Sequence, residues 1–354
     1  MRVDPRSVRT YPLPMASEAT APDLGVAFER RGALARIHLN RPKALNALTL
    51  GMANAMLAKL AEWEADDTVS TIAITGEGRA FCAGGDIRAI YERGRAGEPF
   101  DEFFATEYAL DIALHRYPKP VVALIDGIAM GGGVGVGYHV GHVIVGENAR
   151  FAMPECSIGF FPDVGATHLL NRVGGAGYYL GLTGTRVGPG DQVMLGLADA
   201  FVPSDRWDEL LEALANGDAA DRVVGSYRAE PPTSEEGWSE VVEQATGADL
   251  HDLVSSRGPW KEATAKSDPL AIRIAIRQLT EGKGRSFEDC MRMEARIAYR
   301  MLRGESFYEG IRAAVIDKDQ APQWRYARVE DVPSELVAEY FAPVPDGPLA
   351  GLGG

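Results

Sequence analysis

The sequence predicts an α/β domain built from repeated strand-strand-helix units, followed by a region built from helices alone. Two observations predict the first part: 40 glycines in a chain that is 46% apolar, typical of α/β proteins with many tight turns, and glycine-rich loops that stand at two strand-to-helix junctions. A third predicts the second part, because beyond Pro203 apolar residues recur at helical spacing with no strand pattern between them. We expect a disordered leader (1–23), a core (24–203), a helical region (204–340) and a flexible tail (341–354).

The predicted core opens with a β-hairpin. Residues 26–28 and 33–39 form two short strands around a turn that contains Gly32, and alternate positions of the second strand are apolar. A loop over 40–48 then leads to a helix over 49–64, in which large apolar residues recur at helical spacing.

Two glycine loops follow, each at the end of a buried strand. A strand over 68–75 leads into the first loop, and Asp86 is well placed to cap the helix after it. A strand over 121–125 leads into the second loop, in which five of the seven residues from 131 to 137 are glycine. Without Cβ atoms, such a loop lets a ligand approach the backbone closely.

The remaining predicted elements lie around and beyond these loops. A helix over 100–116 separates the two units, and its Glu107 is interpreted as a surface charge. A helix over 176–182 and a strand over 197–202 close the core. Five helices are predicted in the second region: 207–216, 233–246, 270–278, 287–302 and 307–315.

The second glycine loop predicts a site for a negatively charged oxygen. If a helix begins near Gly132, its first amides have no acceptor within the helix and lie at the positive end of the helix dipole. Backbone donors arranged in this way are what an oxyanion hole requires.

Two carboxylates follow in a loop that does not read as a solvated one. Glu155 and Asp163 stand among apolar, proline and glycine residues, so we expect burial to raise the pKa of both and to prepare them for acid, base or nucleophile chemistry. The alternative is that each carboxylate caps a helix.

Composition excludes several other classes. The formal net charge of −14 argues against nucleic-acid binding. The cysteines, Cys82, Cys156 and Cys290, have no metal-ligand or disulfide spacing, so we expect a reducing, cytoplasmic location and no metal. No apolar run approaches the roughly 20 residues that span a membrane. The glycine run lacks the spacing of a dinucleotide-binding loop, and His139 and His142 are interpreted as packing or surface residues.

Four segments resemble the crotonase (enoyl-CoA hydratase/isomerase) superfamily, in the order in which that superfamily carries them: 41–46, 81–87, 126–133 and 153–155. Two further segments, 160–165 and 316–320, resemble one branch, the 3-hydroxyisobutyryl-CoA hydrolases. The resemblance implies a crotonase-like spiral of strand-strand-helix turns with a C-terminal all-helical region.

The resemblance also implies roles for individual residues. The amides of Gly85 and Gly132 would hold the thioester oxygen of an acyl-CoA, Glu155 and Asp163 would be the catalytic carboxylates, and Glu107 would contact the substrate. Residues of the matching segments near the glycine loops are expected to bind substrate as well: Lys43, Leu45, Ala83, Asp86 and Ile87.

The function that these residues indicate is hydrolysis of a short 3-hydroxyacyl-CoA, with 3-hydroxyisobutyryl-CoA of valine catabolism first and 3-hydroxypropionyl-CoA next. Hydratases of the superfamily carry a glutamate three residues beyond the oxyanion glycine, and Gly135 occupies that position here, so enoyl-CoA hydration is the second hypothesis. A non-catalytic binding protein is the third. We expect no cofactor besides the CoA of the substrate, no nucleic-acid or membrane partner, and a possible homo-oligomer.

Overall fold

The computed structural model describes residues 24–233, 237–256 and 258–353, and the expected leader lies outside them. Its larger sheet has six strands, of which the first two form the predicted antiparallel hairpin and the rest are parallel. Their order across the sheet is β1 (Val26–Arg31), β2 (Leu34–Leu39), β3 (Thr71–Gly76), β5 (Val121–Ile125), β7 (His142–Val145) and β9 (Ala200–Phe201). Parallel strands covered on both faces are apolar throughout, as β5 is.

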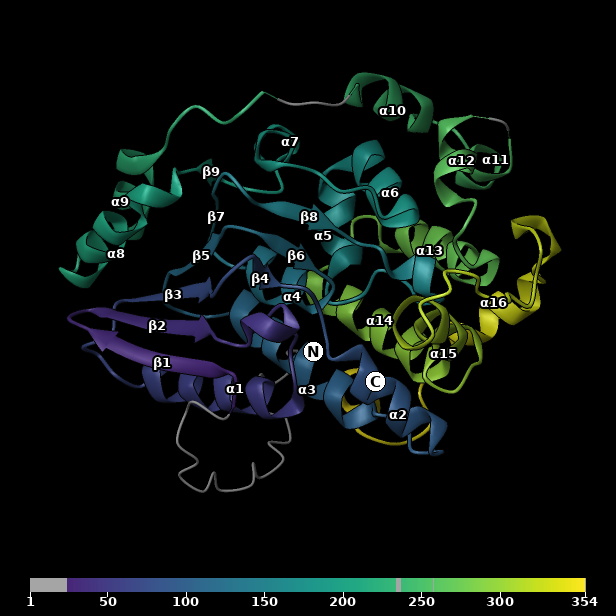
Figure 1. Ribbon diagram of the computed structural model, residues 1–354, viewed down its shortest axis with the longest axis horizontal. Coiled ribbons are helices and arrows are strands. Elements are labelled where there is room, and N and C mark those ends of the chain that lie inside the picture. Colours follow the sequence, from purple (N-terminus) through teal and green to yellow (C-terminus); the bar gives the residue numbers. More distant parts are fainter. Residues whose placement is uncertain (1–23, 234–236, 257, 354) are drawn as a thin grey trace, which may run out of the picture.

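A second, parallel sheet of three short strands lies beside the first: β4 (Ala80–Cys82), β6 (Ile128–Met130) and β8 (Arg150–Ala152). Each of three successive turns of the chain therefore adds one strand to the larger sheet, one strand to the smaller sheet and then a helix. The units β3-β4-α2, β5-β6-α4 and β7-β8-α5 repeat this order (Figure 1). The predicted spiral of strand-strand-helix turns is confirmed.

The helices of the spiral begin where the sequence places capping residues. The Thr49 hydroxyl accepts a hydrogen bond from the amide of Met52 (3.2 Å), and the Asp86 carboxylate accepts one from the amide of Ala89 (3.3 Å), so both predicted N-termini are confirmed. The helices are α1 (Leu50–Glu64), α2 (Ile87–Arg95), α3 (Asp101–His115), α4 (Gly132–Tyr138), α5 (Ala166–Arg172), α6 (Gly174–Thr183) and α7 (Pro189–Leu195).

One predicted strand is shorter than expected. Of the residues 197–202, only Ala200–Phe201 pair with the sheet as β9. The amides of Leu197 and Ala198 instead donate to the carbonyl of Gln192 (2.8 and 3.0 Å), which ends α7. Those two residues therefore complete a helix terminus and cannot extend the strand.

Among its described residues, the second region contains helices and no strand, as predicted, and the helices divide into two groups. Figure 1 shows α8 and α9 at one end of the molecule beside the sheet, and α10 to α16 at the other end. The helices are α8 (Trp207–Ala215), α9 (Ala220–Tyr227), α10 (Trp238–Ala245), α11 (Leu250–Ser255), α12 (Pro259–Thr264), α13 (Pro269–Gly282), α14 (Phe287–Met301), α15 (Ser306–Ile311), α16 (Ser334–Tyr340) and α17 (Ala350–Gly353).

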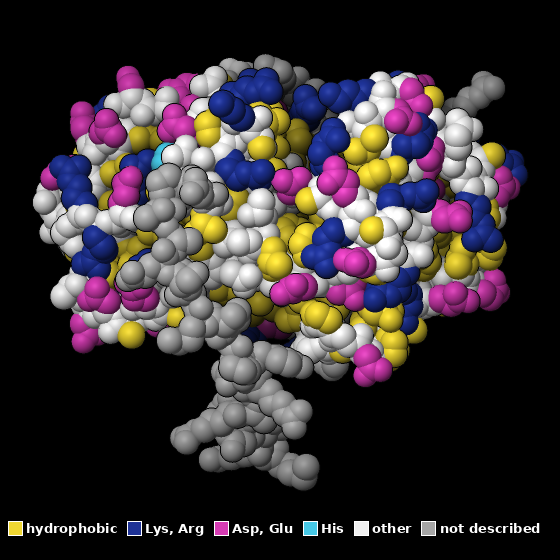
Figure 2. All heavy atoms as spheres, turned by 60° about the horizontal axis from the view of Figure 1, so that its bottom comes forward, with side chains coloured by type: hydrophobic (Ala, Val, Ile, Leu, Met, Phe, Trp, Pro, Cys, Tyr) yellow, Lys and Arg dark blue, Asp and Glu magenta, His cyan; other side chains and the backbone are white. Residues whose placement is uncertain are grey.

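A single hydrophobic core joins the spiral to the second group of helices, whereas α8 and α9 cover a smaller core against the larger sheet. The segment that we expected to be a flexible tail contributes to the main core, because Phe341 and Leu349 are buried there and α17 packs on α14. On the face shown in Figure 2, the described Lys and Arg side chains are interspersed with Asp and Glu and do not form one basic stripe.

Candidate active site

The two glycine loops meet, and glycine residues allow their backbones to approach each other closely. A Cβ atom on Gly84 would lie 3.3 Å from the carbonyl oxygen of Met130 and 3.8 Å from the amide nitrogen of Gly132. A Cβ atom on Gly131, whose φ is +48°, would lie 3.2 Å from Oε1 of Glu155. The glycines therefore bring two backbone segments and one carboxylate together at a single place.

Two amides at this place lack a role in the surrounding secondary structure. A parallel bridge pairs Leu48 with Gly85, but its hydrogen bonds use the Gly84 carbonyl (2.8 Å) and the Asp86 amide (2.9 Å), so the Gly85 amide takes no part in it. Gly132 is the first residue of α4, as predicted, and a first-turn amide has no acceptor within its helix. Both predicted oxyanion donors thus belong to the two loops that meet.

Glu107 lies against the same glycines. It is only 2% exposed, and a Cβ atom on Gly132 would collide with its Oε1 atom. The interpretation of Glu107 as a surface charge is wrong, because α3 packs against α1, α4 and α14 and has no solvent-facing side at this residue. The structure instead places the carboxyl of Glu107 against Gly132, one of the two predicted oxyanion glycines.

Glu155 and Asp163 are also buried, at 6% and 4% exposure. Neither acts as a helix cap: the N-cap of the 3₁₀ turn Glu155–Ile158 is Pro154 and that of α5 is Gly165, so the capping alternative is wrong. The Tyr108 hydroxyl donates a hydrogen bond of 2.8 Å to Oδ2 of Asp163. Asp163 is thereby tied to α3, the helix that carries Glu107.

The loop after Asp163 is held by buried polar side chains. Glu294 of α14 accepts hydrogen bonds from the amides of Gly165 (2.7 Å) and Thr167 (2.9 Å), and a ring nitrogen of His139 lies 2.8 Å from the Val164 carbonyl. Val164 has a φ of +55°, which a β-branched residue rarely adopts. Strain of this kind persists where neighbouring contacts hold the backbone in place. Here the hydrogen bonds of Glu294 and His139 hold Val164, the residue next to Asp163.

Burial dominates the electrostatics of the site. It raises the pKa of Asp163 to about 7, against the hydrogen bond from Tyr108, which lowers it. The pKa values of Glu107 and Glu155 lie well above the usual range, first because of burial and then because of the charge of Asp163. Near neutral pH the cluster therefore binds protons and can supply both an acid and a base.

Of the other predicted substrate-binding residues, Ala83 and Asp86 belong to the first glycine loop and Ile87 begins α2 directly after it. Ala83 donates from its amide to the carbonyl of Leu45 (3.0 Å), which joins the two matching segments. Asp86 pairs with Arg41 (3.2 Å). Lys43 is exposed, whereas the rest of this group is half-buried: Leu45, Ala83, Asp86 and Ile87.

Reasoning from the sequence missed three buried residues of the site: Tyr108, Asp111 and Glu294. Asp111 is fully buried, and neither of its carboxylate oxygens has a hydrogen-bond partner among the described residues. One signal was available for two of these residues, because Tyr108 and Asp111 follow Glu107 by one and four positions on a largely apolar helix. Glu294 carries no comparable signal, since it lies 131 residues beyond Asp163 in a charge-rich helix.

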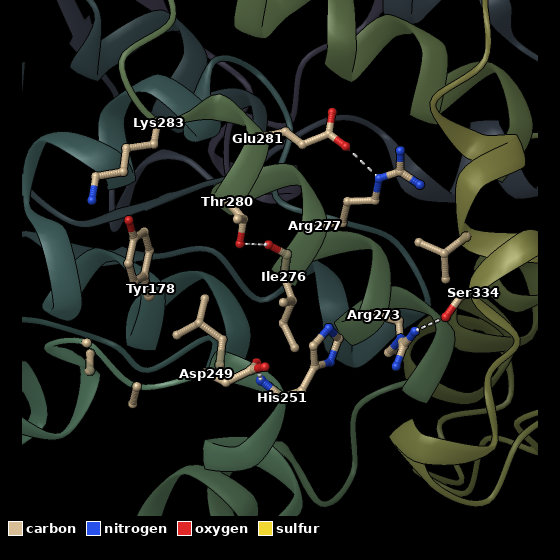
Figure 3. Close-up of a pocket in the computed structure, with 15 residues that line it drawn as sticks. Tyr178, Asp249, His251, Arg273, Ile276, Arg277, Thr280, Glu281, Lys283 and Ser334 are labelled. Atoms are coloured by element: carbon tan, nitrogen blue, oxygen red, sulfur yellow. Dashed lines mark hydrogen bonds and ion pairs between the residues drawn. The ribbon is translucent and has the colours of Figure 1, made fainter.

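A separate cavity of about 780 Å³ opens between α6, α11, α13 and α16 (Figure 3). Its walls carry charges of both signs: Arg277 pairs with Glu281 (2.6 Å), and Arg273 donates to the neutral hydroxyl of Ser334 (2.9 Å). None of Glu107, Glu155 and Asp163 lines this cavity, so it is distinct from the candidate active site.

Comparison with known proteins gives consistent relatives. The model of the enoyl-CoA hydratase/isomerase family matches residues 34–341. The protein named 3-hydroxyisobutyryl-CoA hydrolase, mitochondrial, of Gallus gallus is 38% identical, over 92% of this chain and 90% of its own. The protein of the same name from Rattus norvegicus is 39% identical, over 89% of this chain and 88% of its own.

Two solved structures match over nearly the whole chain. A carnitinyl-CoA dehydratase from Mycobacterium thermoresistibile is 38% identical with a TM-score of 0.83, and the match covers 91% of this chain and 97% of that one. An enoyl-CoA hydratase from Rhodobacter sphaeroides is 40% identical with a TM-score of 0.82, covering 90% and 98%. In the described part of the chain, no helix has the length and apolar character needed to cross a bilayer.

Proposed function

The chain belongs to the enoyl-CoA hydratase/isomerase family, and we propose that it hydrolyses the thioester bond of short 3-hydroxyacyl-CoA substrates, 3-hydroxyisobutyryl-CoA foremost. Relatives with the hydrolase name share 38% and 39% of their residues with it over about nine tenths of the chain. The likeness extends along almost the full length of both proteins, so it includes the loop of Asp163 and the C-terminal helices.

One observation in the site carries the choice of hydrolysis over hydration. The position at which hydratases hold their first glutamate is Gly135, and a Cβ atom there would lie 2.5 Å from Oδ1 of Asp111. No side chain fits at this position without displacing Asp111. Hydration loses one general acid or base, a contribution of about 10²- to 10⁴-fold in rate, whereas thioester cleavage needs only a nucleophile, a proton donor and an oxyanion hole.

In the proposed reaction, the amides of Gly85 and Gly132 bind the thioester carbonyl oxygen and stabilise the negative charge that develops on it. The Glu155 carboxylate attacks the carbonyl carbon, the carbon–sulfur bond breaks, and the CoA thiolate takes a proton from Asp163. Water then opens the resulting mixed anhydride. Burial raises the pKa of Asp163 to about 7 and that of Glu155 well above its usual range, so above about pH 7 the two carboxyls share one proton. The form that reacts is the one in which Asp163 holds this proton and Glu155 is ionised.

Selectivity for a 3-hydroxyl group is proposed to reside in Asp163. The acyl group would lie beside apolar side chains such as those of Phe104 and Phe160, whose ring centroids are 5.6 Å apart. A buried hydroxyl without a partner costs about 1 to 3 kcal/mol, so a carboxyl group in this setting favours a substrate that carries one.

The test is the release of free thiol from a panel of CoA esters. We expect rapid release from 3-hydroxyisobutyryl-CoA, slower release from 3-hydroxypropionyl-CoA and much slower release from isobutyryl-CoA. A protein that binds these esters without cleaving any of them would support the non-catalytic alternative.

Enoyl-CoA hydration is the second candidate, and a specific observation favours it. The two solved structures that match at 38% and 40% identity carry dehydratase and hydratase names. Hydration of crotonyl-CoA, followed by the loss of its enoyl absorbance, measures this activity directly.

Three further expectations belong to this proposal. The reaction needs no cofactor beyond the CoA of the substrate, the protein assembles as a homo-oligomer, and its location is cytoplasmic. The free cysteines Cys82, Cys156 and Cys290 are all buried, which supports a reducing compartment, although the relatives' names place those proteins in mitochondria. Light scattering tests the assembly, and cell fractionation tests the location.

A further inference from the structure

The loop that carries Asp163 has a backbone conformation that its own residues do not favour. Val164 has a φ of +55° and Gly165 a φ of +83°, so two successive residues lie in the left-handed region, which a β-branched residue such as valine rarely adopts. Conformations of this kind persist where the surrounding structure fixes them, and they cluster at active sites. The contacts that fix this loop are therefore candidates for a role in the reaction.

Glu294 of α14 provides three of these contacts. Its exposure is 0%, and both of its carboxylate oxygens accept hydrogen bonds from the loop. Oε2 accepts from the Gly165 amide (2.7 Å), and Oε1 accepts from the amide (2.9 Å) and from the hydroxyl of Thr167. One carboxylate thus holds the backbone at positions two and four residues beyond Asp163.

Gln278 of α13 holds the other side of Asp163. Its side chain is fully buried, and its Nε2 atom donates to the carbonyl of Pro162 (2.5 Å) and to the hydroxyl oxygen of Thr167 (2.7 Å). Because the Thr167 hydroxyl donates in turn to Glu294, it links the two helices. The chain on both sides of Asp163 is therefore bonded to the second, helical region of the protein.

Packing alone does not account for a carboxylate at Glu294. The partners named above are two amides and a hydroxyl, which carry no charge, and burial of a charged group without a cation costs far more than burial of an apolar side chain. An apolar residue of similar size would fill the same space. It would also leave the buried amides of Gly165 and Thr167 without an acceptor, at about 1 to 3 kcal/mol each. The carboxylate is therefore matched to the loop conformation.

We propose that Glu294 is a positioning residue for Asp163, and that the reaction therefore depends on the C-terminal helical region as well as on the spiral. The inference rests on the proposed function, in which Asp163 protonates the leaving thiolate and binds the 3-hydroxyl group of the substrate. Glu294 forms no bond to the substrate and exchanges no proton with it.

The route from Glu294 to Asp163 is short. The Gly165 amide that Glu294 binds is two residues from Asp163. The hydrogen bond from Tyr108 orients the Asp163 side chain but does not fix the backbone from which that side chain projects. Without Glu294 we expect Val164 to relax toward the negative φ values that valine favours, which displaces Asp163. Displacement of a reacting group by about 1 Å can lower a rate about 10²-fold.

Two substitutions weaken this hold while the size of the side chain is kept. Glu294→Gln replaces one acceptor oxygen by an amide group, so one of the two loop amides loses its acceptor. Thr167→Val removes the hydroxyl that links Glu294 to Gln278. Thr264→Val is the matched control, because Thr264 is another buried threonine, and its hydroxyl donates to the Trp260 carbonyl (2.9 Å) within α12.

The expected effect is on turnover and on selectivity together. In Glu294→Gln and Thr167→Val, kcat for thiol release from 3-hydroxyisobutyryl-CoA should fall about 10- to 10²-fold. The preference for this ester over isobutyryl-CoA should fall as well, because the partner of the 3-hydroxyl group is displaced. A loss of stability alone would lower the rates on both esters equally. Thr264→Val should keep the wild-type rate and preference.

The assays are run with Glu294 ionised. Burial raises the pKa of Glu294 to about 8, although the hydrogen bonds from Thr167 and Gly165 lower it. At about pH 9 most of the carboxylate is charged, so the wild-type loop has its acceptor.

A double-mutant cycle shows whether Glu294 acts through Asp163. Two residues that act through the same group have non-additive effects. Glu294→Gln or Thr167→Val, added to Asp163→Asn, should therefore lower kcat by less than about twofold beyond Asp163→Asn alone. The same additions to the wild-type protein should cause the full loss.

The outcomes are distinguishable, and thermal unfolding curves show which variants fold. The role of Glu294 is overturned by a folded variant with the wild-type rate and preference, or by one whose loss is undiminished in the Asp163→Asn protein. If Glu294→Gln does not fold, the cycle with Thr167→Val gives the decision. Failure of the wild-type protein to release thiol from any of the esters contradicts the proposed function instead.

Discussion

The hydroxyl of Tyr108 donates a hydrogen bond of 2.8 Å to the carboxylate of Asp163, and both side chains are buried. These residues come from a helix and a loop that are separated by 55 positions in the chain. Since a hydrogen bond to the charged form of a carboxyl stabilises that form, Tyr108 lowers the pKa of Asp163 while burial raises it to about 7.

Removal of the Tyr108 hydroxyl should therefore shift the pH profile of thiol release. In the wild-type protein we expect kcat/KM to rise as the pH rises through about 7, because below this pH both Asp163 and Glu155 hold protons, and loss of the first proton leaves the pair with one proton and one carboxylate. In Tyr108→Phe the pKa of Asp163 rises further, so this rise in kcat/KM should begin at a higher pH. Profiles of kcat/KM against pH for both proteins check this. Tyr138→Phe is the control, because it removes another buried hydroxyl, which bonds to Gln192 (2.7 Å), and it should keep the wild-type profile. A profile of Tyr108→Phe that shifts to lower pH contradicts the expectation.

Substitution of the two catalytic carboxyls should have effects of different kinds. Glu155→Gln should nearly abolish thiol release from every CoA ester, because an amide is a poor nucleophile. Asp163→Asn should lower the rate and also reduce the preference for 3-hydroxyisobutyryl-CoA over isobutyryl-CoA. Specificity constants on the two esters are the measurement. An Asp163→Asn protein that keeps the full preference would place the selectivity elsewhere.

The oxyanion amide of Gly132 can be tested only with a paired substitution. A Cβ atom at this position collides with Oε1 of Glu107, so Gly132→Pro disturbs a carboxyl as well as removing the amide. Gly132→Ala adds the same Cβ atom and keeps the amide. We expect turnover to fall in both, and to be about 10²- to 10³-fold lower in Gly132→Pro than in Gly132→Ala, the usual effect of one oxyanion donor.

A difference counts only if both variants fold, which their thermal unfolding curves show. Equal turnover in the two folded variants would mean that the Gly132 amide does not bind the carbonyl oxygen.

Removal of bound metal should leave the activity unchanged. In the proposed reaction, the Gly85 and Gly132 amides polarise the carbonyl and Glu155 supplies the nucleophile, so no step requires a metal-bound water. Thiol release is measured before and after exhaustive dialysis against EDTA. Loss of activity that added Mg²⁺ or Zn²⁺ restores would contradict the expectation.

The fold was predictable because its signals are local. Thr49 and Asp86 mark helix starts, and glycine loops mark the turns between strand and helix, so the spiral follows from short stretches of sequence. The two carboxylates Glu155 and Asp163 were predictable for the same reason, since proline, glycine and apolar neighbours within a few residues indicate burial.

The missed residues depend on contacts between distant segments. The burial of Glu107 results from the packing of α1, α4 and α14 against α3, and no pattern within α3 predicts it. Glu294 acquires its role only when α14 reaches the Asp163 loop, where it bonds to the Gly165 amide. The close approach of Asp111 to Gly135 likewise joins two helices, so a helical period alone assigns Asp111 no partner.

The central claim is that this site cleaves thioesters and does not hydrate double bonds. Its most direct test is a comparison of kcat/KM for thiol release from 3-hydroxyisobutyryl-CoA with kcat/KM for hydration of crotonyl-CoA, on one preparation of the protein. We expect thiol release to exceed hydration by at least about 10²-fold, since the hydratase glutamate is replaced by Gly135. Rapid hydration without thiol release would contradict the account.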